Sequence, residues 1–228
     1  MTKRDRAILK HVGLYRMSLR VVLERNFFGG KSCHNVVQRL MKQRYLQSVR
    51  PRGLNFSYYQ LTTRATAMLG LPSYRAGLIG TQALQTHLGT LWFCMMGKAK
   101  RHRLEETALE RLFGEDYPDG PHCAEEAERV CLYHAYAPGH SVEVENVIRQ
   151  IRERLEATLA RPKVRPWIET RQYGFVVLVD TDDRRGTLRE ALRRATFEGD
   201  NISTRAYIRL ELAPSPRTLT EAIHDIRT

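Results

Sequence analysis

The residues best suited to recognise another molecule lie between Lys31 and Gln43. Read as a helix, this segment gathers its apolar residues on one face, namely Cys33, Val36, Val37, Leu40 and Met41. The other side holds a set that we call the polar face: Lys31, Ser32, His34, Asn35, Gln38, Arg39 and Lys42. Arginine can bind guanine O6 and N7 together, and asparagine or glutamine can pair with adenine in the major groove. The segment therefore predicts a helix that contacts base edges of double-stranded DNA, although an ordinary amphipathic helix with a solvated basic face fits the same pattern.

The distribution of charge favours the DNA interpretation. The chain has 228 residues and a net charge of +12. Residues 1–75 contain 15 Lys and Arg but only two acids, Asp5 and Glu24, whereas the rest of the chain has a balance of −1. Positive charge confined to one third of a chain indicates a polyanionic partner, most simply the phosphate backbone of nucleic acid.

Several classes of protein are disfavoured by the composition. No run approaches the roughly 18 apolar residues that a membrane helix requires, and the start MTKRDR lacks the apolar core of a signal peptide. Four cysteines in a chain of this length do not make a disulfide scaffold. We therefore expect a cytoplasmic protein with no membrane partner, and no motif indicates a cofactor.

The helices and strands predicted before and after the polar face follow a defined order along the chain. Thr2 and Asp5 have the spacing of a capping box for a first helix that ends near Gly13 to Arg16. Ser18 is expected to cap a second helix, and Gly29-Gly30 to form the turn before the third. Two strands are predicted at 45–49 and 56–61, followed by a helix capped by Thr62.

This order is that of a winged helix-turn-helix. The tip of the predicted two-stranded wing carries Arg50, Arg52 and Asn55, which can reach phosphate or a minor groove. A plain basic hairpin is the alternative for this segment. Helix order, hairpin and local charge together predict a DNA-binding domain over residues 1–72.

Three segments resemble the N-terminal part of the plasmid replication-relaxation family: TKRDRAIL, VVQRLMKQRYLQSVRP and YYQLTTRATAMLG. The matching positions are Asp5, Arg6, Ile8, Leu9, Arg39, Leu40, Leu46, Tyr59, Leu61, Thr62, Leu69 and Gly70. The chain departs from the family at Ala65, where a glycine is often found. The resemblance covers about a third of the chain and implies a winged-helix DNA binder of plasmids and mobile elements.

The middle of the chain, residues 73–116, is predicted to be a linker followed by helices. Residues 73–82 look like the linker, and residues 83–96 form a helix with an apolar stripe: Leu84, Leu88, Leu91, Trp92 and Met95. Such a stripe is either core or the contact between two copies of the chain. We assign it to dimerisation, because a single DNA-binding module buries little surface and a dimer joins two half-sites.

Residues 117–228 predict a small α/β domain with a partly parallel sheet, so the fold class is mixed, α+β with an α/β part. Strands are expected at 130–136, 174–179 and 206–212, alternating with helices at 142–159, 188–195 and 219–226. Pro118-Asp119 resembles a motif of restriction-endonuclease-like folds, but the strand VCLYHAY has neither the acid nor the lysine that such nucleases need. The resemblance is therefore that of a non-catalytic relative.

Two metal sites remain as alternatives. Asp180, Asp182 and Asp183 follow a buried strand, where α/β proteins place ligands, and with Asp119 they would build a metal-dependent nuclease. His122, Cys123, Cys131 and His134 suggest zinc, but Cys131 and His134 would project from opposite faces of one strand. We predict no metal and no catalysis. The expected function is a homodimeric, sequence-specific transcription regulator of a plasmid or mobile element. A plasmid replication or mobilisation accessory protein is the first alternative, and the nuclease is the second.

Overall fold

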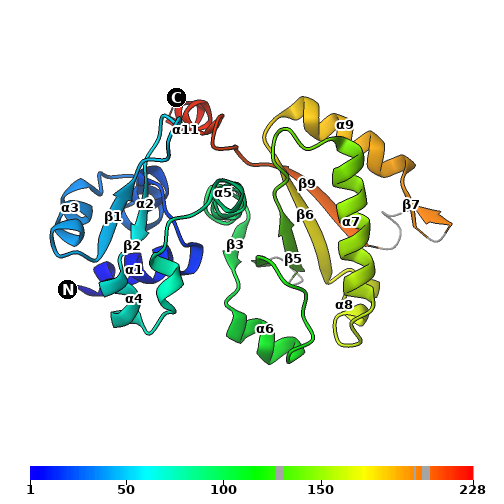
Figure 1. Cartoon of the computed structure of the whole chain (residues 1–228), viewed down its shortest axis with the longest axis horizontal. Helices are drawn as coiled ribbons and strands as arrows, with labels where there is room; N and C mark the ends of the chain where they lie inside the picture. Colours follow the sequence, from blue (N-terminus) through cyan, green and yellow to red (C-terminus); the bar gives the residue numbers. More distant parts are fainter. Residues whose placement is uncertain (127–130, 198, 202–205, 228) are drawn as a thin grey trace. The chain divides into compact units, whose positions relative to one another are not determined.

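The computed structural model describes residues 1–126, 131–197, 199–201 and 206–227, which form two compact units of mixed α and β structure (Figure 1). The first unit comprises Met1–Leu91 together with the last residues of the chain from Pro216, and the second comprises Trp92–Ser215. The units part at Leu91 rather than at the predicted boundaries after residues 72 and 116. Among the described residues, no helix combines the length and the apolar character that crossing a bilayer requires.

The first unit is mainly helical with one hairpin. In chain order its elements are α1 (Lys3–Tyr15), α2 (Arg20–Phe28), α3 (His34–Lys42), β1 (Leu46–Val49), β2 (Tyr58–Leu61), α4 (Thr63–Leu69), the 3-10 helix η1 (Ser73–Ala76), most of α5 (Thr81–Met95) and α11 (Leu219–Arg227). β1 and β2 are antiparallel, with Leu46 opposite Leu61. Ser18 adds an isolated bridge to Tyr59 on β2, so the hairpin is tied to the segment between α1 and α2.

Two of the three predicted helix caps in this unit are confirmed, and one is wrong. Thr2 and Asp5 form the predicted capping box, and the Thr62 side chain accepts a hydrogen bond from the Ala65 N–H as expected. The predicted cap at Ser18 is wrong, because Leu19 is the N-cap residue of α2. The Ser18 side chain is instead buried and lies 3.0 Å from Nε2 of His11.

The core of the first unit joins α1, α3 and the hairpin. Buried side chains from these elements form one cluster that includes Ile8, Leu9, Val12, Cys33, Val37, Leu40, Leu46 and Leu61. The predicted apolar face of α3 is confirmed, since Val36 and Met41 also pack against this cluster. Full burial of one such aliphatic side chain stabilises a fold by about 1.5–3 kcal/mol, so α3 has a fixed orientation and its opposite side must face solvent.

The segment predicted to be a linker is ordered by two arginines. Arg16 donates to the carbonyl of Tyr74 at 3.0 Å, and Arg75 donates to the carbonyl of Gly13 at 2.9 Å. η1 is therefore fixed to the end of α1, so residues 73–76 of the predicted linker are part of the first unit. The partners are about 60 positions apart in the sequence, so no local pattern could have indicated this contact.

The second unit is built on a mixed five-stranded sheet in the order β3-β4-β5-β6-β9 (Figure 1). The strands are β3 (Lys100–Arg103), β4 (His122–Glu126), β5 (Cys131–Tyr136), β6 (Tyr173–Val179) and β9 (Tyr207–Leu212). The helices are α6 (Glu106–Phe113), α7 (Val144–Leu159), α8 (Arg165–Glu169) and α9 (Asp182–Arg194), and β7 (Thr196–Phe197) pairs with β8 (Asp200–Asn201).

The sheet has an antiparallel and a parallel half. β3, β4 and β5 form an antiparallel meander, and β5, β6 and β9 are parallel. The predicted parallel strands are confirmed, except that Val130 lies outside the described residues. β3 and β4 were not predicted, because their residues, KRHR and HCAEE, lack the apolar alternation of a half-buried strand.

The two faces of this sheet differ in chemistry. One face packs against α6, α7, α8 and α9 through an apolar cluster that includes Phe113, Ile151, Leu155, Phe175, Val177 and Leu188. The other face carries charged side chains from β3, β4 and β9 together with Tyr133 of β5. β6 is buried along its whole length, as its continuous apolar run predicted.

Candidate nucleic-acid interface

The polar face is exposed along its whole length. All seven of its residues are exposed, and all three residues predicted for the loop between β1 and β2, Arg50, Arg52 and Asn55, are exposed as well. The turn before α3 is made by Gly29 and Gly30, whose φ angles of 58° and 82° suit glycine. α3 begins at His34 and not at Lys31 as predicted, so Lys31 and Ser32 lie in the turn before the helix. The other residues are presented to solvent by α3 or by the loop of the hairpin, and both elements are fixed to one core.

The start of α3 is held by a small polar cluster that the sequence analysis did not assign. Arg20 and Glu24 form an ion pair at 2.7 Å, and Glu24 accepts a hydrogen bond from the Cys33 N–H at 3.3 Å. Ser32 accepts hydrogen bonds from Arg20 and from the His34 N–H, both at 3.3 Å. Ser32 therefore has partners within the chain, and its first role is to order the helix start. The spacing of four between Arg20 and Glu24 was a signal that could have indicated their pairing.

Arg39 also has a partner within the chain. Its Nη2 lies 2.6 Å from Oδ1 of Asp5, whose side chain is only 2% exposed, whereas the Arg39 side chain is 46% exposed. Burial opposes ionisation of Asp5, but hydrogen bonds from Thr2 and Arg39 outweigh it and hold the pKa of Asp5 below its usual value. Arg39 was predicted to contact bases, whereas its pairing with Asp5 was not predicted from the sequence.

The other side chains of the polar face have no polar partner within the described residues. The side chains of Lys31, His34, Asn35, Gln38 and Lys42 form no hydrogen bond or ion pair there. At about 100° per residue, Asn35 and Lys42 lie roughly opposite the buried side of α3, with Gln38 and Arg39 on either flank. Amide and ammonium groups without partners at the centre of this face are chemically suited to base edges and phosphate.

The loop between β1 and β2 supplies two further cations. Arg50 and Arg52 are exposed and have no partner among the described residues, whereas the nearby Phe56 is 9% exposed and anchors the loop. Gly53 has a φ of 75° and allows the chain to turn at the tip. The loop can therefore extend a positive charge away from the core without an acid to neutralise it.

The predicted dimer stripe has a different environment. Leu84, Leu88 and Leu91 are at most 2% exposed in the single chain, and Trp92 and Met95 are partly buried. The three leucines therefore belong to the core of the chain in this conformation, and the dimer contact predicted for them would require α5 to leave its packing. Dimerisation itself stays a prediction.

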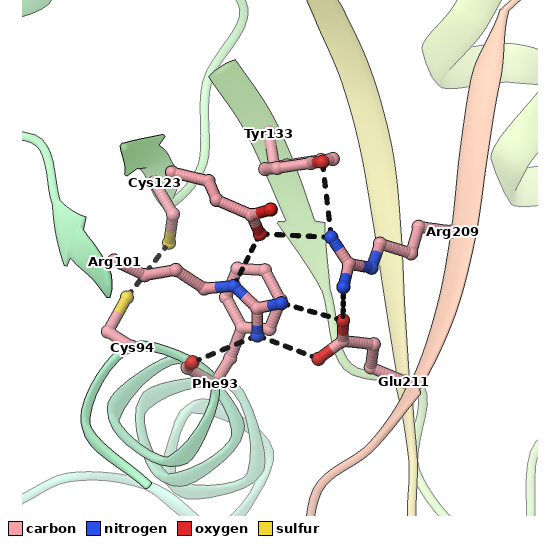
Figure 2. A network of polar contacts seen from close by, with 8 residues as sticks. Phe93, Cys94, Arg101, Cys123, Tyr133, Arg209 and Glu211 are labelled. Atoms are coloured by element: carbon pink, nitrogen blue, oxygen red, sulfur yellow. Dashed lines mark hydrogen bonds and ion pairs between the residues drawn. The ribbon is translucent and has the colours of Figure 1, made fainter. Parts of the chain in front are cut away.

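A second concentration of charge lies on the sheet face of the second unit (Figure 2). Arg101 of β3 contacts Glu125 at 2.6 Å and binds Glu211 of β9 through two hydrogen bonds of 2.8 Å. Arg209 contacts Glu125 at 2.9 Å and also pairs with Glu211. We call these four residues, with Tyr133, the sheet-face network. It joins the two edge strands of the sheet.

The geometry of the sheet-face network indicates a structural role. The Arg101 side chain is 3% exposed, stacks on the ring of Phe93 at 4.0 Å and donates to the Phe93 carbonyl at 3.3 Å. Burial opposes the charge on Arg101, but its bonds to Glu211 and Glu125 raise its pKa above the usual value. Because each acid already has cations as partners, the network does not offer free carboxylates to a metal or substrate.

Neither of the two alternative metal sites is assembled among the described residues. Asp180 pairs with His140 at 2.8 Å, Asp182 pairs with Arg185, and Thr181 caps α9. Within the described ranges, no three His, Cys, Asp or Glu residues are placed to hold a metal ion. Asp180 and Asp182 are thus engaged in local structure.

The two histidines of the suggested zinc quartet meet in the core. His122 and His134 have ring centroids 4.9 Å apart, and His122 Nε2 lies 2.7 Å from the Tyr173 hydroxyl. Arg154 donates to Nε2 of His134 at 3.2 Å, so that nitrogen accepts and the proton resides on Nδ1. Burial lowers the pKa of His122 to about 4 and also lowers that of His134. Cys123 is instead 3.5 Å from Cys94, sulfur to sulfur (Figure 2).

No family model, curated protein or solved structure matches this chain. The resemblance to the replication-relaxation family therefore stays a prediction from the N-terminal motifs.

Proposed function

We propose that this protein is a sequence-specific, double-stranded DNA-binding transcription regulator of the winged helix-turn-helix type. The observation that carries the proposal is the polar face of α3, which is exposed, has no acid among its residues and stands on a packed core. A helix of this kind fits the major groove, where each base pair presents its own pattern of donors and acceptors.

The surroundings of α3 support a winged-helix assignment. Three helices precede the hairpin, and the Ser18 bridge to Tyr59 gives the hairpin a short third partner. The loop of the hairpin carries Arg50 and Arg52 on the exposed side. In this proposal α3 enters the major groove and the loop contacts the neighbouring backbone or minor groove.

The residues divide into two roles. Gln38 and Asn35 have amide groups that can pair with adenine, and Arg39 can bind guanine, so these three read bases. Lys31, Lys42, Arg50 and Arg52 are cations without a partner among the described residues, and they contact phosphate. We propose no catalytic step, and the motifs that resemble the replication-relaxation family suggest a plasmid or mobile element as the setting. A replication or mobilisation accessory protein would use the same interface.

The decisive experiment is selection of bound sequences from a pool of random duplexes by the full-length protein, repeated with Gln38→Ala. We expect one enriched motif, and loss of about 1–3 kcal/mol of discrimination at one of its base pairs in the variant. Gln172→Ala is the matched control, because Gln172 is an exposed glutamine of the second unit. Absence of any enriched motif, or equal effects of both substitutions, would overturn the proposal.

The same selection tests the homodimer. A two-fold dimer should enrich a palindrome with half-sites about 10 base pairs, or a multiple of that, apart. Sedimentation of the full-length protein at micromolar concentration should show two copies. A single unrepeated half-site together with a monomeric sedimentation coefficient would remove the dimer from the proposal and leave the DNA-binding part intact.

A further inference from the structure

The ion pair between Asp5 and Arg39 links the start of α1 to the polar face of α3. Nη2 of Arg39 and Oδ1 of Asp5 are 2.6 Å apart, which is short for a charge-assisted hydrogen bond. Only this one nitrogen of the guanidinium has a partner among the described residues. The side chain is 46% exposed, so its other donors remain accessible from solvent.

Asp5 is itself held firmly. Its Oδ2 accepts a hydrogen bond from the Thr2 N–H at 2.8 Å, and its own N–H donates to Oγ1 of Thr2 at 3.1 Å. The carboxylate is almost fully buried, and its other oxygen, Oδ1, binds Arg39. A buried carboxylate that is fixed at both oxygens gives its cation a single preferred position.

The fixed position matters because of what arginine can recognise. A guanidinium presents five donors in a planar fork, and two of them match O6 and N7 of guanine. A free arginine loses side-chain entropy when it is immobilised on a base, whereas one held in place by a carboxylate has already lost part of it. Arg39 lies on the flank of the polar face, with Asn35 one turn before it and Lys42 about one turn after it on the same side of the helix.

We propose that Asp5 is a positioning residue that holds Arg39 for a two-bond contact with a guanine, and that it sets the base preference at one position of the bound site. This inference rests on the proposed function. Asp5 does not touch DNA in this arrangement. It acts through Arg39, and its own place is set by the capping box of α1.

Substitutions at Asp5 can separate charge from helix capping. Asp5→Glu keeps the charge and places the residue type that a capping box prefers, and Asp5→Asn keeps an oxygen that can accept the Thr2 N–H but removes the charge. Thr2→Ala weakens the cap and leaves the pair with Arg39. Each full-length variant is titrated with the selected duplex and with duplexes that carry each other base pair at each position, and its melting temperature is measured.

We expect the wild-type protein to prefer guanine at one position by about 10-fold or more. Asp5→Asn and Arg39→Ala should each abolish that preference, and the double variant should lose nothing further. Asp5→Glu should retain most of it, and Thr2→Ala should lower the melting temperature and keep the preference. Lys42→Ala should weaken binding to all duplexes alike.

Several results would overturn the inference. If Asp5→Asn keeps the guanine preference, or lowers affinity for every duplex equally, Asp5 is a structural residue only. If it raises affinity for every duplex, Asp5 withholds the charge of Arg39 from DNA instead of positioning it. These results leave the proposed function standing. If the wild-type protein shows no base preference, the proposed function is overturned as well. The titrations of the wild-type protein alone reveal this outcome, so it is distinguishable from a failure of the inference about Asp5.

Discussion

The polar face of α3 and the sheet-face network both contain basic side chains, but these side chains differ in exposure and in pairing. On the polar face, Lys31 and Lys42 are exposed and have no acidic partner among the described residues. In the sheet-face network, Arg101 is 3% exposed and bound to two glutamates. A cation without a partner keeps its full attraction for a polyanion, whereas a buried and paired cation specifies how strands meet.

Arg39 stands between these two cases. It is paired with an acid, as Arg101 is, but almost half of its side chain is exposed, as on the rest of the polar face. Partial pairing combines a fixed position with accessible donors, which is the property expected of a side chain that reads a base. The comparison therefore indicates that exposure and pairing together, rather than charge alone, decide what a basic residue does.

The largest effect is expected from a substitution in the buried sheet-face network. Arg101→Met leaves Glu125 and Glu211 with Arg209 as their remaining cation in the network, and removal of one member of a buried ion pair costs about 3–5 kcal/mol. Urea denaturation should show this loss in the free energy of unfolding. The control is Lys100→Met, since the Lys100 side chain is 79% exposed and should be replaceable with little change. Equal effects of the two substitutions would show that the network is not a stabilising element.

Acid should destabilise the protein through its buried histidines. An unfolded histidine binds a proton near pH 6.5, whereas burial lowers the pKa of His122 to about 4. Between these values the unfolded chain binds more protons, so the stability that is present above pH 6.5 is lost as the pH falls toward 4. For His122 alone this amounts to about 2 kcal/mol between pH 7 and pH 5.

His122→Gln provides the test, because a glutamine can still bond to Tyr173 or to the Gly120 carbonyl but does not titrate. Its free energy of unfolding, measured by urea denaturation at both pH values, should depend less on pH than that of the wild-type protein. An unchanged pH dependence would mean that His122 is not the group responsible. His11 in the first unit, whose pKa burial also lowers to about 4, would then be the next residue to test.

A smaller effect is expected from a substitution of an exposed cation in the loop between β1 and β2. Arg52→Ala should weaken binding to all duplexes alike and reduce the dependence of log K on log salt concentration by about one. Arg165→Ala is the matched control, because Arg165 is 61% exposed but paired with Glu169. Fluorescence anisotropy at several salt concentrations separates the two. A change of sequence preference in Arg52→Ala would show that the loop reads bases rather than phosphate.

Much of the first unit could be predicted from sequence, because its signals are local. The capping box, the glycine turn and the apolar spacing of α3 each lie within a few residues, and the structure has all of them. The exposed polar face followed from that spacing, since a helix that buries one side must expose the other. Only its use as a DNA-binding surface stays untested.

The features that were not predicted from the sequence depend on contacts between residues far apart in the chain. β3 lies in the segment that was predicted to be a linker followed by helices, because nothing near Arg101 indicates that Glu211, 110 positions later, neutralises it. The hydrogen bonds of Arg16 and Arg75 and the pair of Asp5 with Arg39 are also long-range. Spacing rules describe one element at a time, so they cannot assign partners across elements.

We propose that the exposed lysines of the polar face, Lys31 and Lys42, bind duplex DNA. The most direct measurement is the salt dependence of binding to a random duplex by the full-length protein, compared with a Lys31→Ala, Lys42→Ala double variant. The control double variant removes Arg149 and Arg193, which are exposed but paired with Glu153 and Glu190. We predict that the slope of log K against log salt concentration falls by about two in the first variant and stays unchanged in the control. Equal slopes in all three proteins, or no binding by the wild-type protein at low salt, would contradict the claim.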